Sequence, residues 1–463
     1  MRKIVGLVCL LALYQGVMAG YAAAQGKTVR SVPPTTSGSP IPPGTIKLLG
    51  PDNHSLGKFT AQNLLTSEMN ERLLRERAGI KNGTIDTVPY FDSWFITGTR
   101  NSIYPYSMVG HNPAQGGTTG INNEVIPLIS VLTLGGVPVY TFDPTAVNDP
   151  QGSDISLIEA SPLYDATTTY PGNGRGLKPD KGQVIDTAQR AEFTGVRKAG
   201  WHTHLNPPTS SGIIWIQFLE FNNGDWTCMM GSGPPCAAGD FPVVNINTIS
   251  NNFGFILGVE APANSTVPII VTDFVTAFIP GPGGGCCVLG YHNAQTGIVD
   301  PAGVLVWTWA TFIPQTTSSG LANPFAPFGN DVMVLSHELS ELFNDPFINT
   351  SVSPWVDGSA SFAQGNLETG DVIEAMNTVD VIYNVPLMPG GKPYTYTLQN
   401  VALLEWFTRN PLGPVSGPGP GVYSWPNTNV LNNGHNPGAG CGGNPGCWVY
   451  GEGSAGFYFG PPY

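Results

Sequence analysis

Short apolar runs of strand length, each bounded by turn residues, are the feature that most constrains how this chain can fold. The clearest runs cover 124–134, 137–142, 213–221, 267–279 and 304–313. Their β-branched and aromatic residues favour buried strands, and the Gly, Pro, Asn and Asp residues between them favour turns. No motif recurs at a fixed spacing, which argues against a solenoid or a propeller. We therefore expect a loop-rich chain dominated by β-structure.

Three segments have helical patterns instead, namely 60–78, 331–344 and 399–408. In the second of these, apolar residues recur at spacings of three and four, so they share one face of a helix. Asn330 or Asp331 can cap the start of that helix, and Asp345-Pro346 ends it. A helix set against strands places the chain in the α+β class.

The N-terminus has the pattern of a secretory signal. Two basic residues precede an apolar run over 4–14, and small residues follow it up to Ala24. The run is too short to span a bilayer, and we expect cleavage after Ala24 or Ala19. Residues 25–47 are rich in Pro, Ser and Thr and predict an extended leader. An exported, soluble protein, periplasmic or extracellular, is expected.

Six cysteines remain after the expected signal. An even number in an exported protein favours disulfides over free thiols. The shortest loops to close join Cys228 to Cys236 and Cys441 to Cys447, while Cys286 and Cys287 are adjacent. No CxxC pair occurs, so the zinc-knuckle spacing is absent.

The charge of the chain bears on its partners. Charged residues make up only 11% of the sequence, and the net charge is −13. Nucleic acids and anionic lipid surfaces are bound through basic patches, and the sequence has no basic cluster. We expect neither as a partner, and no later segment has the length and apolar character of a transmembrane helix.

The stretch SHELSELFNDP, residues 336–346, resembles the HExxH helix of zinc proteases with a glutamate in place of the second histidine. His337 and Glu341 are four residues apart and therefore lie side by side, opposite the apolar face. Zinc accepts carboxylate oxygen, so both side chains can be ligands, with Glu338 as the general base. The alternative is an amphipathic helix whose solvated face carries a hydrogen bond between the two residues and no metal.

A third ligand can come from the segment NLETGDVIEAM, which contains Glu368, Asp371 and Glu374. Carboxylates gathered in a chain with so few charges suggest a cation that offsets their repulsion. Zinc is the expected cation. Calcium and manganese are alternatives, because a ligand set with one histidine and several carboxylates also suits harder cations.

Other histidines and acids are weaker candidates. His292, in GYHNA, is expected in a turn between two strands and is a possible additional ligand. His202 and His204 form an HxH pair, but no acid follows at the spacing of a cupin site. The acidic loop 143–154 can hold calcium but lacks the glutamate of an EF-hand.

Several motifs spread over the chain carry a resemblance to a known group. They are PYSMVG (105–110), GGTT (116–119), DTAQRAEF (186–193), GYHNA (290–294), SHELSELFNDP (336–346), NLETGD (366–371) and LLEWF (403–407). With these the chain resembles exported bacterial proteins of uncharacterised function that share a HExxE helix and are described as zincin-like. The resemblance implies export and a metal site but no substrate. Against HExxH peptidases the likeness covers the helix alone, and Glu341 departs from their pattern.

The predicted organisation follows from these patterns and from the resemblance. It comprises a signal peptide (1–24), a leader (25–47), a β-rich N-terminal unit (48–225), a zincin-like unit with its active-site helix on a sheet (226–410), and a Gly/Pro-rich tail (411–463).

Two hypotheses of function remain open. In the first, the protein is a secreted metal-dependent hydrolase, metallopeptidase-like, acting on a peptide or polymer. His337, Glu341 and Glu368 bind zinc, Asp371 is a further candidate ligand, and Glu338 activates water. In the second, it is a non-catalytic secreted protein with a structural cation or none, whose aromatic-rich β-surface binds a wall polymer or a protein partner. The sequence predicts no oligomeric state.

Overall fold

A computed structural model gives the fold of most of the chain after residue 85. It describes residues 86–97, 102–147, 149–172, 178–194, 197–209, 217–222, 224–229, 231–237, 240–281, 285–296, 298, 303–315, 325, 329–356, 363–375, 381–407, 423–428 and 430–431. All of them belong to one compact unit, Ser39–Tyr463. The chain is α+β with more strand than helix, as predicted. The predicted signal, leader and helix 60–78 lie outside the described residues, as does nearly all of the predicted tail.

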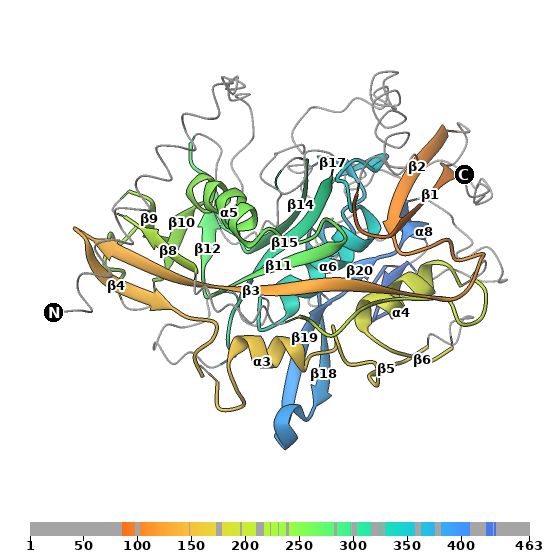
Figure 1. Ribbon diagram of the computed structural model, residues 1–463, viewed down its shortest axis with the longest axis horizontal. Coiled ribbons are helices and arrows are strands. Elements are labelled where there is room, and N and C mark those ends of the chain that lie inside the picture. The colour runs from red at the N-terminus through yellow and green to blue at the C-terminus, as the bar shows by residue number, and fades with distance from the viewer. Residues whose placement is uncertain are drawn as a thin grey trace, which may run out of the picture. The chain divides into compact units, whose positions relative to one another are not determined.

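A seven-stranded sheet forms the centre of the described structure (Figure 1). Its strands are β3 (Thr118–Leu134), β4 (Val137–Phe142), β7 (His202–Leu205), β8 (Gln217–Phe221), β11 (Thr266–Asp273), β14 (Gly290–Thr296) and β15 (Val304–Phe312). The order is β14-β15-β11-β3-β4, and β7 and β8 both pair with the long strand β3. Strands β3, β11 and β15 are parallel, whereas β14 and β4 are antiparallel edges. The two predicted units therefore contribute strands to one sheet.

A four-stranded sheet has the order β13-β12-β10-β9. Its strands are β9 (Trp226–Cys228), β10 (Pro242–Asn245), β12 (Thr276–Phe278) and β13 (Cys286–Val288). The run 267–279, predicted as a single strand, is thus divided between two sheets. The division falls after β11, where Phe274 has a φ of 51°, a left-handed conformation that no strand can contain.

The remaining strands form two-stranded sheets. These are β1 (Tyr90–Thr97) with β2 (Ser102–Val109), β5 (Thr169–Tyr170) with β6 (Asp180–Lys181), β16 (Ser351–Val356) with β17 (Ala363–Asn366), β18 (Ile382–Leu387) with β19 (Tyr394–Gln399), and β20 (Val401–Ala402) with β21 (Ser424–Trp425).

The described helices are short apart from two. They are α3 (Asp154–Glu159), α4 (Val184–Glu192), α5 (Ile246–Glu260), α6 (Met333–Asn344), α7 (Asp371–Ala375), α8 (Leu404–Phe407) and the 3-10 turn η3 (Pro389–Gly391). The predicted helix 399–408 is wrong over its first half, because Gln399 ends β19 and Val401 pairs with Trp425. No described helix is long and apolar enough to cross a membrane.

Helix α6 confirms the predicted helix 331–344, with a different start. Val332 occupies the N-cap position without a side-chain hydrogen bond. Asp331, one of the two predicted caps, accepts hydrogen bonds from the backbone N–H groups of Val332 and Thr397 instead. Every residue of α6 is buried, which rules out the alternative of an amphipathic helix with a solvated face. The face that carries His337 is covered by other parts of the protein.

Helices α5 and α6 cover opposite faces of the β14–β15 pair. Phe253 of α5 packs against Tyr291, Trp307 and Trp309, whose side chains share one face of these strands. His292, the next residue along β14, faces the other way and lies 3.6 Å from a carboxylate oxygen of Glu338 in α6. The sheet is therefore covered on both sides here, and α6 lies on the side of His292.

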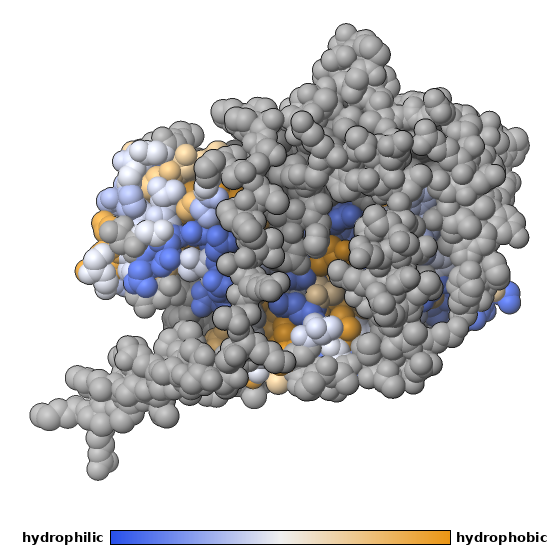
Figure 2. Space-filling view, turned by 90° about the horizontal axis from the view of Figure 1, so that it is seen from above, coloured by the Kyte–Doolittle hydropathy of each residue, from blue (hydrophilic) through white to orange (hydrophobic). Residues whose placement is uncertain are grey.

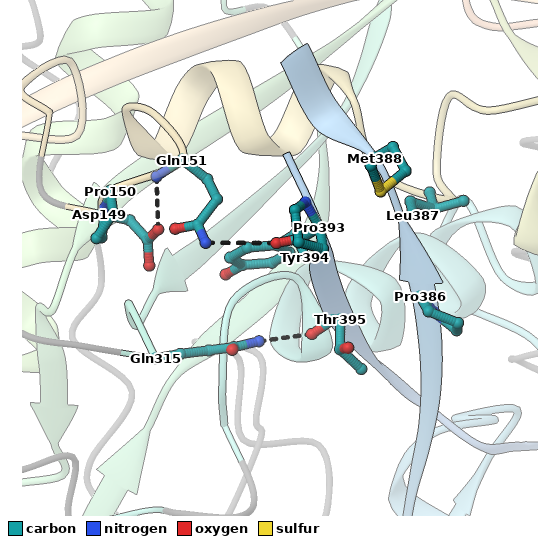
Figure 3. Close-up of a pocket in the computed structure, with 10 residues that line it drawn as sticks. All are labelled: Asp149, Pro150, Gln151, Gln315, Pro386, Leu387, Met388, Pro393, Tyr394 and Thr395. Atoms are coloured by element: carbon teal, nitrogen blue, oxygen red, sulfur yellow. Dashed lines mark hydrogen bonds between the residues drawn. The ribbon is translucent and has the colours of Figure 1, made fainter. Parts of the chain in front are cut away.

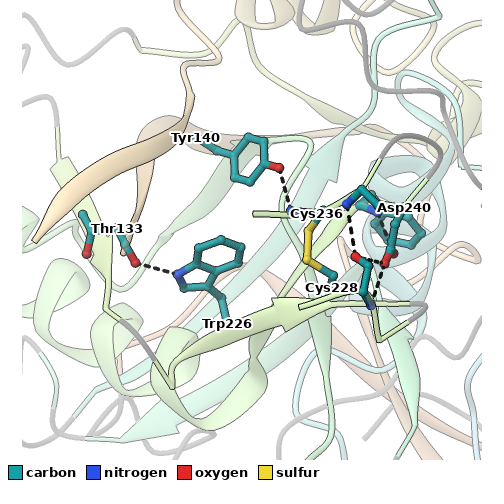
Figure 4. Close-up of a disulfide and its surroundings, with 9 residues drawn as sticks. Thr133, Tyr140, Trp226, Cys228, Cys236 and Asp240 are labelled. Atoms are coloured by element: carbon teal, nitrogen blue, oxygen red, sulfur yellow. Dashed lines mark hydrogen bonds between the residues drawn. A yellow bond between two sulfur atoms is a disulfide. The ribbon is translucent and has the colours of Figure 1, made fainter. Parts of the chain in front are cut away.

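One of the two shortest predicted disulfides is confirmed. Cys228 and Cys236 are bonded at 2.04 Å (Figure 4). The N–H of Cys236 donates to the Tyr140 hydroxyl, and the indole N–H of Trp226 donates to the carbonyl of Thr133, so β4 and β3 hold this loop in place. Cys286 and Cys287 form a second, vicinal pair. The predicted pair Cys441 and Cys447 lies outside the described residues.

Few large hydrophobic side chains are exposed in the described part of the chain. They are Val137, Val147, Val259 and Met388, and none is aromatic. The coloured part of Figure 2 accordingly shows hydrophobic atoms interspersed with hydrophilic ones.

Gly290 lets α6 approach the edge strand closely. A Cβ atom at this position would lie 2.7 Å from the carbonyl oxygen of Trp309 and 2.8 Å from a methyl carbon of Val334. Gly290→Ala should therefore lower the free energy of unfolding by about 1–3 kcal/mol, the usual cost of overpacking a tight core. Chemical denaturation measures this change in the free energy of unfolding. Gly254→Ala in α5 is the matched control, because nothing lies near its added methyl group and alanine favours helix by about 1 kcal/mol. Equal effects of the two changes would contradict the proposed close approach.

The buried carboxyl group of Glu192 predicts a pH dependence of stability. Burial raises the pKa of Glu192 to about 8, and burial followed by the charge of Glu192 raises the pKa of Glu405. Between about pH 4.5 and 8 the folded chain keeps a proton that the unfolded chain releases, so the free energy of unfolding falls as the pH rises. Glu192→Gln should reduce this slope by up to about 1.4 kcal/mol per pH unit in denaturation series. An unaltered slope in Glu192→Gln would contradict the prediction.

Candidate functional site

Three polar side chains of α6 meet in the protein interior. His337 is fully buried, and Glu338 and Glu341 are nearly so. A spacing of four brings His337 and Glu341 together across one helical turn, and their atoms Nε2 and Oε2 are 3.1 Å apart. Burial of charged groups on this scale requires partners, which come from three other segments of the chain.

Gln399, at the end of β19, fixes the protonation of His337. The Gln399 Nε2 donates to the carbonyl of Gly370 at 2.8 Å, which sets the orientation of the amide. Its Oε1 can then only accept, and it lies 2.8 Å from Nδ1 of His337. Nδ1 therefore carries a proton, and the other ring nitrogen, Nε2, faces the carboxylates. A hydrogen bond of this kind is how proteins orient histidine ligands of metals.

The backbone of Gly370 and Asp371 holds the carboxylate of Glu341 in place. Its Oε1 accepts hydrogen bonds from the backbone N–H groups of Gly370 and Asp371, at 3.0 and 3.2 Å. The other oxygen, Oε2, is left facing His337. Gly370 is needed here because a Cβ atom at this position would overlap the His337 ring.

The segment 367–375 brings the three predicted acids to α6. Oδ1 of Asp371 is 3.6 Å from Nε2 of His337, and Oε2 of Glu374 is 4.0 Å from its Nδ1. Glu368 lies elsewhere in the cluster, with Oε2 4.0 Å from Nε2 of His292. The structure therefore gathers all three acids, but only Asp371 and Glu374 lie beside His337.

His292 reaches the cluster from the sheet. The expected turn is wrong, since GYHNA is the start of β14, which pairs with β15. Nδ1 of His292 is 3.6 Å from Glu338 and 3.7 Å from Glu341, in each case from Oε2. Its Nε2 is buried and has no hydrogen-bond partner. His292 thus joins the predicted helix residues in one cluster.

Burial and mutual repulsion set the charges of the cluster. Burial raises the pKa of Glu338, and burial followed by the charges of Glu341 and Asp371 raises the pKa of Glu368 well above its usual range. Burial would lower the pKa of His337, but Glu341 and the other carboxylates outweigh it and raise this pKa well above 6.5. In Glu341 the His337 charge overcomes burial and lowers the pKa. The cluster therefore favours positive charge at its centre.

The spacing of the donor atoms suits a metal ion. Two ligands at about 2.0–2.2 Å from a tetrahedral cation are about 3.3–3.6 Å apart. Nε2 of His337 is 3.1 Å from Glu341 and 3.6 Å from Asp371, close to this range. Nε2 makes no hydrogen bond of acceptable geometry in spite of these neighbours. Among the described residues, three sets have ligand atoms within 4.8 Å of one another: His337, Glu338 and Glu341; His337, Asp371 and Glu374; and His292, Glu341 and Glu368.

The other sequence candidates lie outside these three sets. His202, in β7, pairs through Nδ1 with Asp186 at 3.0 Å, and neither it nor His204 belongs to a set of possible metal ligands. In the loop 143–154, Asp143 accepts hydrogen bonds from Thr145, and Asp149 accepts one from Gln151. Sequence reasoning missed Gln399, because no local pattern reveals a side chain whose partners are 29 and 62 residues away.

A pocket of about 450 Å³ lies apart from the cluster (Figure 3). Its walls include Gln151, Gln315 and Tyr394, and Gln315 donates to the carbonyl of Thr395 and to Asp331. None of its lining residues belongs to the cluster. The pocket therefore carries no part of the candidate metal site.

Comparisons with known proteins find no significant match. No protein-family model matches the chain, and no curated protein and no solved structure matches it significantly.

Gln399→Leu should weaken cation binding about 10–100-fold, the usual effect of losing the partner that orients a histidine ligand. The change keeps the side-chain volume but removes the acceptor for Nδ1 of His337. Competition with a chromophoric chelator measures the affinity for zinc. Gln295→Leu is the control, because this amide lies on the opposite face of β14 and bonds Trp307. Equal affinities of Gln399→Leu and the control would contradict this role of Gln399.

Proposed function

We propose that the protein is a metal-dependent hydrolase whose cation is bound by His337, Glu341 and Asp371. The observation that carries the proposal is that the buried Nε2 of His337 makes no hydrogen bond but lies 3.1 Å from a carboxylate oxygen of Glu341 and 3.6 Å from one of Asp371. Since Gln399 supplies an acceptor to Nδ1, a proton or a cation must lie between Nε2 and Oε2 of Glu341. A divalent cation also offsets more of the negative charge of the cluster than a single proton does.

The proposed ligand set differs from the first expectation in its third member. Glu368 was expected to join His337 and Glu341, but its nearest described imidazole is that of His292. Asp371 takes this place in the proposal because its Oδ1 lies nearer to His337. The order β14, β15, α6, with the helix packed on both strands, supports a zincin-like arrangement of this part of the chain.

In the proposed reaction Glu338 is the general base. The bound cation supplies a Lewis acid that lowers the pKa of a water molecule. Glu338 has one oxygen, Oε1, without a hydrogen-bond partner, and it shares a set of possible ligands with His337 and Glu341. Burial raises its pKa, which brings a carboxylate closer to the range of an effective base. Glu338 accepts the proton of the water and transfers it to the leaving group.

The substrate class of the proposal is a peptide or polymer outside the cytoplasm. The disulfide Cys228–Cys236 and the expected signal peptide support export. The likeness of α6 to HExxH helices supports a peptide bond as the target.

A structural cation site is the second candidate function, and the burial of the donors favours it. None of the side chains of His337, Glu341, Glu368 or Asp371 is more than 11% exposed. A structural cation is usually enclosed by protein ligands, whereas a catalytic one keeps a position open to substrate. The aromatic binding surface once expected for a non-catalytic protein has no support in the described residues, whose exposed large hydrophobic side chains include no aromatic.

Glu338→Gln distinguishes the two candidates. The full mature chain is loaded with zinc and assayed on labelled casein and on a library of internally quenched peptides. The change should lower hydrolysis about 10²–10⁴-fold, as removal of a general base does, and leave the zinc content within error of the wild type. Glu159→Gln, on the exposed side of α3, should keep full activity.

Hydrolysis by Glu338→Gln at the wild-type rate would contradict the proposed mechanism. If the wild-type protein retains zinc and loses thermal stability on chelation, yet hydrolyses none of these substrates, the structural candidate replaces the hydrolase.

A further inference from the structure

The cluster contains more ligands than one cation needs. Besides His337, Glu341 and Asp371 it holds His292, and the carboxyl groups of Glu338, Glu368 and Glu374. A single catalytic cation takes three protein ligands as a rule. The surplus groups lie in two places, because Glu374 lies beside His337 and Glu368 lies beside His292.

We propose that His292, Glu341 and Glu368 form a second cation site, and that Glu341 bridges two cations. The proposal rests on the first cation being bound at His337. The proposed site thus binds two cations that share one carboxylate, whereas an HExxH helix binds a single ion.

The geometry around Glu341 supports the bridge. One oxygen, Oε2, is 3.1 Å from Nε2 of His337 and 3.7 Å from Nδ1 of His292. The two imidazoles come from different elements, α6 and β14, so they approach this oxygen independently. The other oxygen is anchored by the N–H groups of Gly370 and Asp371, which prevents Glu341 from turning toward only one histidine. Cations in two-metal sites are about 3.5–4 Å apart, a distance that one carboxylate can bridge.

The burial of His292 and its missing hydrogen bond also indicate a bound ligand. It is 4% exposed, and its Nε2 has no hydrogen-bond partner although the ring lies among three carboxylates. A buried polar atom without a partner costs about 1–3 kcal/mol, so such atoms are rare unless an ion or water completes them. Oε2 of Glu368 lies 4.0 Å from this Nε2, and one ligand atom each of His292, Glu341 and Glu368 lies within 4.8 Å of the other two.

The balance of charge favours a second cation as well. Five carboxyl groups and two imidazoles share this buried space, and one divalent cation leaves most of the negative charge uncompensated. A carboxylate-rich set with one histidine per cation suits a cation harder than zinc, such as Mn²⁺. Two-metal sites in hydrolases hold the attacking and the leaving oxygen together, which fits the proposed reaction.

Counting bound Mn²⁺ tests the second site. The full mature chain is stripped with a chelator, titrated with Mn²⁺, and analysed for metal content and for its electron paramagnetic resonance spectrum. The wild type should bind two Mn²⁺ per chain, and magnetic coupling should broaden the multi-line spectrum of an isolated ion. His292→Ala and Glu368→Gln should each bind one Mn²⁺ with the uncoupled spectrum. His204→Ala and Glu159→Gln, outside the cluster, should behave as the wild type.

Further outcomes separate this proposal from the proposed function. Asp371→Asn should lose the first cation and leave an uncoupled ion at His292. If the wild type binds one Mn²⁺ and Asp371→Asn removes it while His292→Ala and Glu368→Gln do not, the second site is refuted and the first stands. If His292→Ala also removes that single ion, one cation takes both histidines and the bridge is refuted. A wild type without bound metal refutes both. Glu368→Gln keeps the shape of the side chain. If His292→Ala fails to fold, the number of Mn²⁺ ions bound by Glu368→Gln therefore decides whether the second site exists.

Discussion

The hydrogen bond between Nδ1 of His337 and Oε1 of Gln399 is the interaction on which the site depends. It determines which nitrogen of the ring carries the proton, and it directs the other nitrogen at Glu341 and Asp371. Gln399 in turn is held by the carbonyl of Gly370, and the N–H of Gly370 holds Glu341. One short segment thus positions both the histidine and its neighbouring carboxylate.

The fold buries these hydrogen bonds in the protein interior. Helix α6 is buried on all sides, with β14 and β15 beneath it and with β19, α4, β2 and the segment 367–375 around it. Charges are strongly coupled in such an interior, because little water screens them. This is why the carboxylates raise the pKa of His337 against the effect of burial, and why a bound cation would stabilise the cluster more than it would on the surface.

The sequence predicted those features that depend on local patterns. Residues 137–142 and 304–313 are strands because β-branched and aromatic residues dominate them, and α6 follows from its apolar period. Helix α5 was not foreseen, since INTISNNFGFILGVE carries no charge until its last residue and so has little contrast between faces. The segment 267–279 looked continuous, but a left-handed residue divides it. The acids of 366–376 could be named as candidates from composition alone. Which of them faces His337 and which faces His292, and the part played by Gln399, depend on contacts between distant segments.

Anomalous diffraction from crystals of the metal-loaded mature protein tests the central claim most directly. Data collected on either side of the absorption edge of the bound metal locate the cation independently of the protein atoms. The account predicts an anomalous peak about 2.0–2.2 Å from Nε2 of His337, with Glu341 and Asp371 as further ligands. A crystal without that peak, in which His337 donates a proton from Nε2 to Glu341, would contradict it.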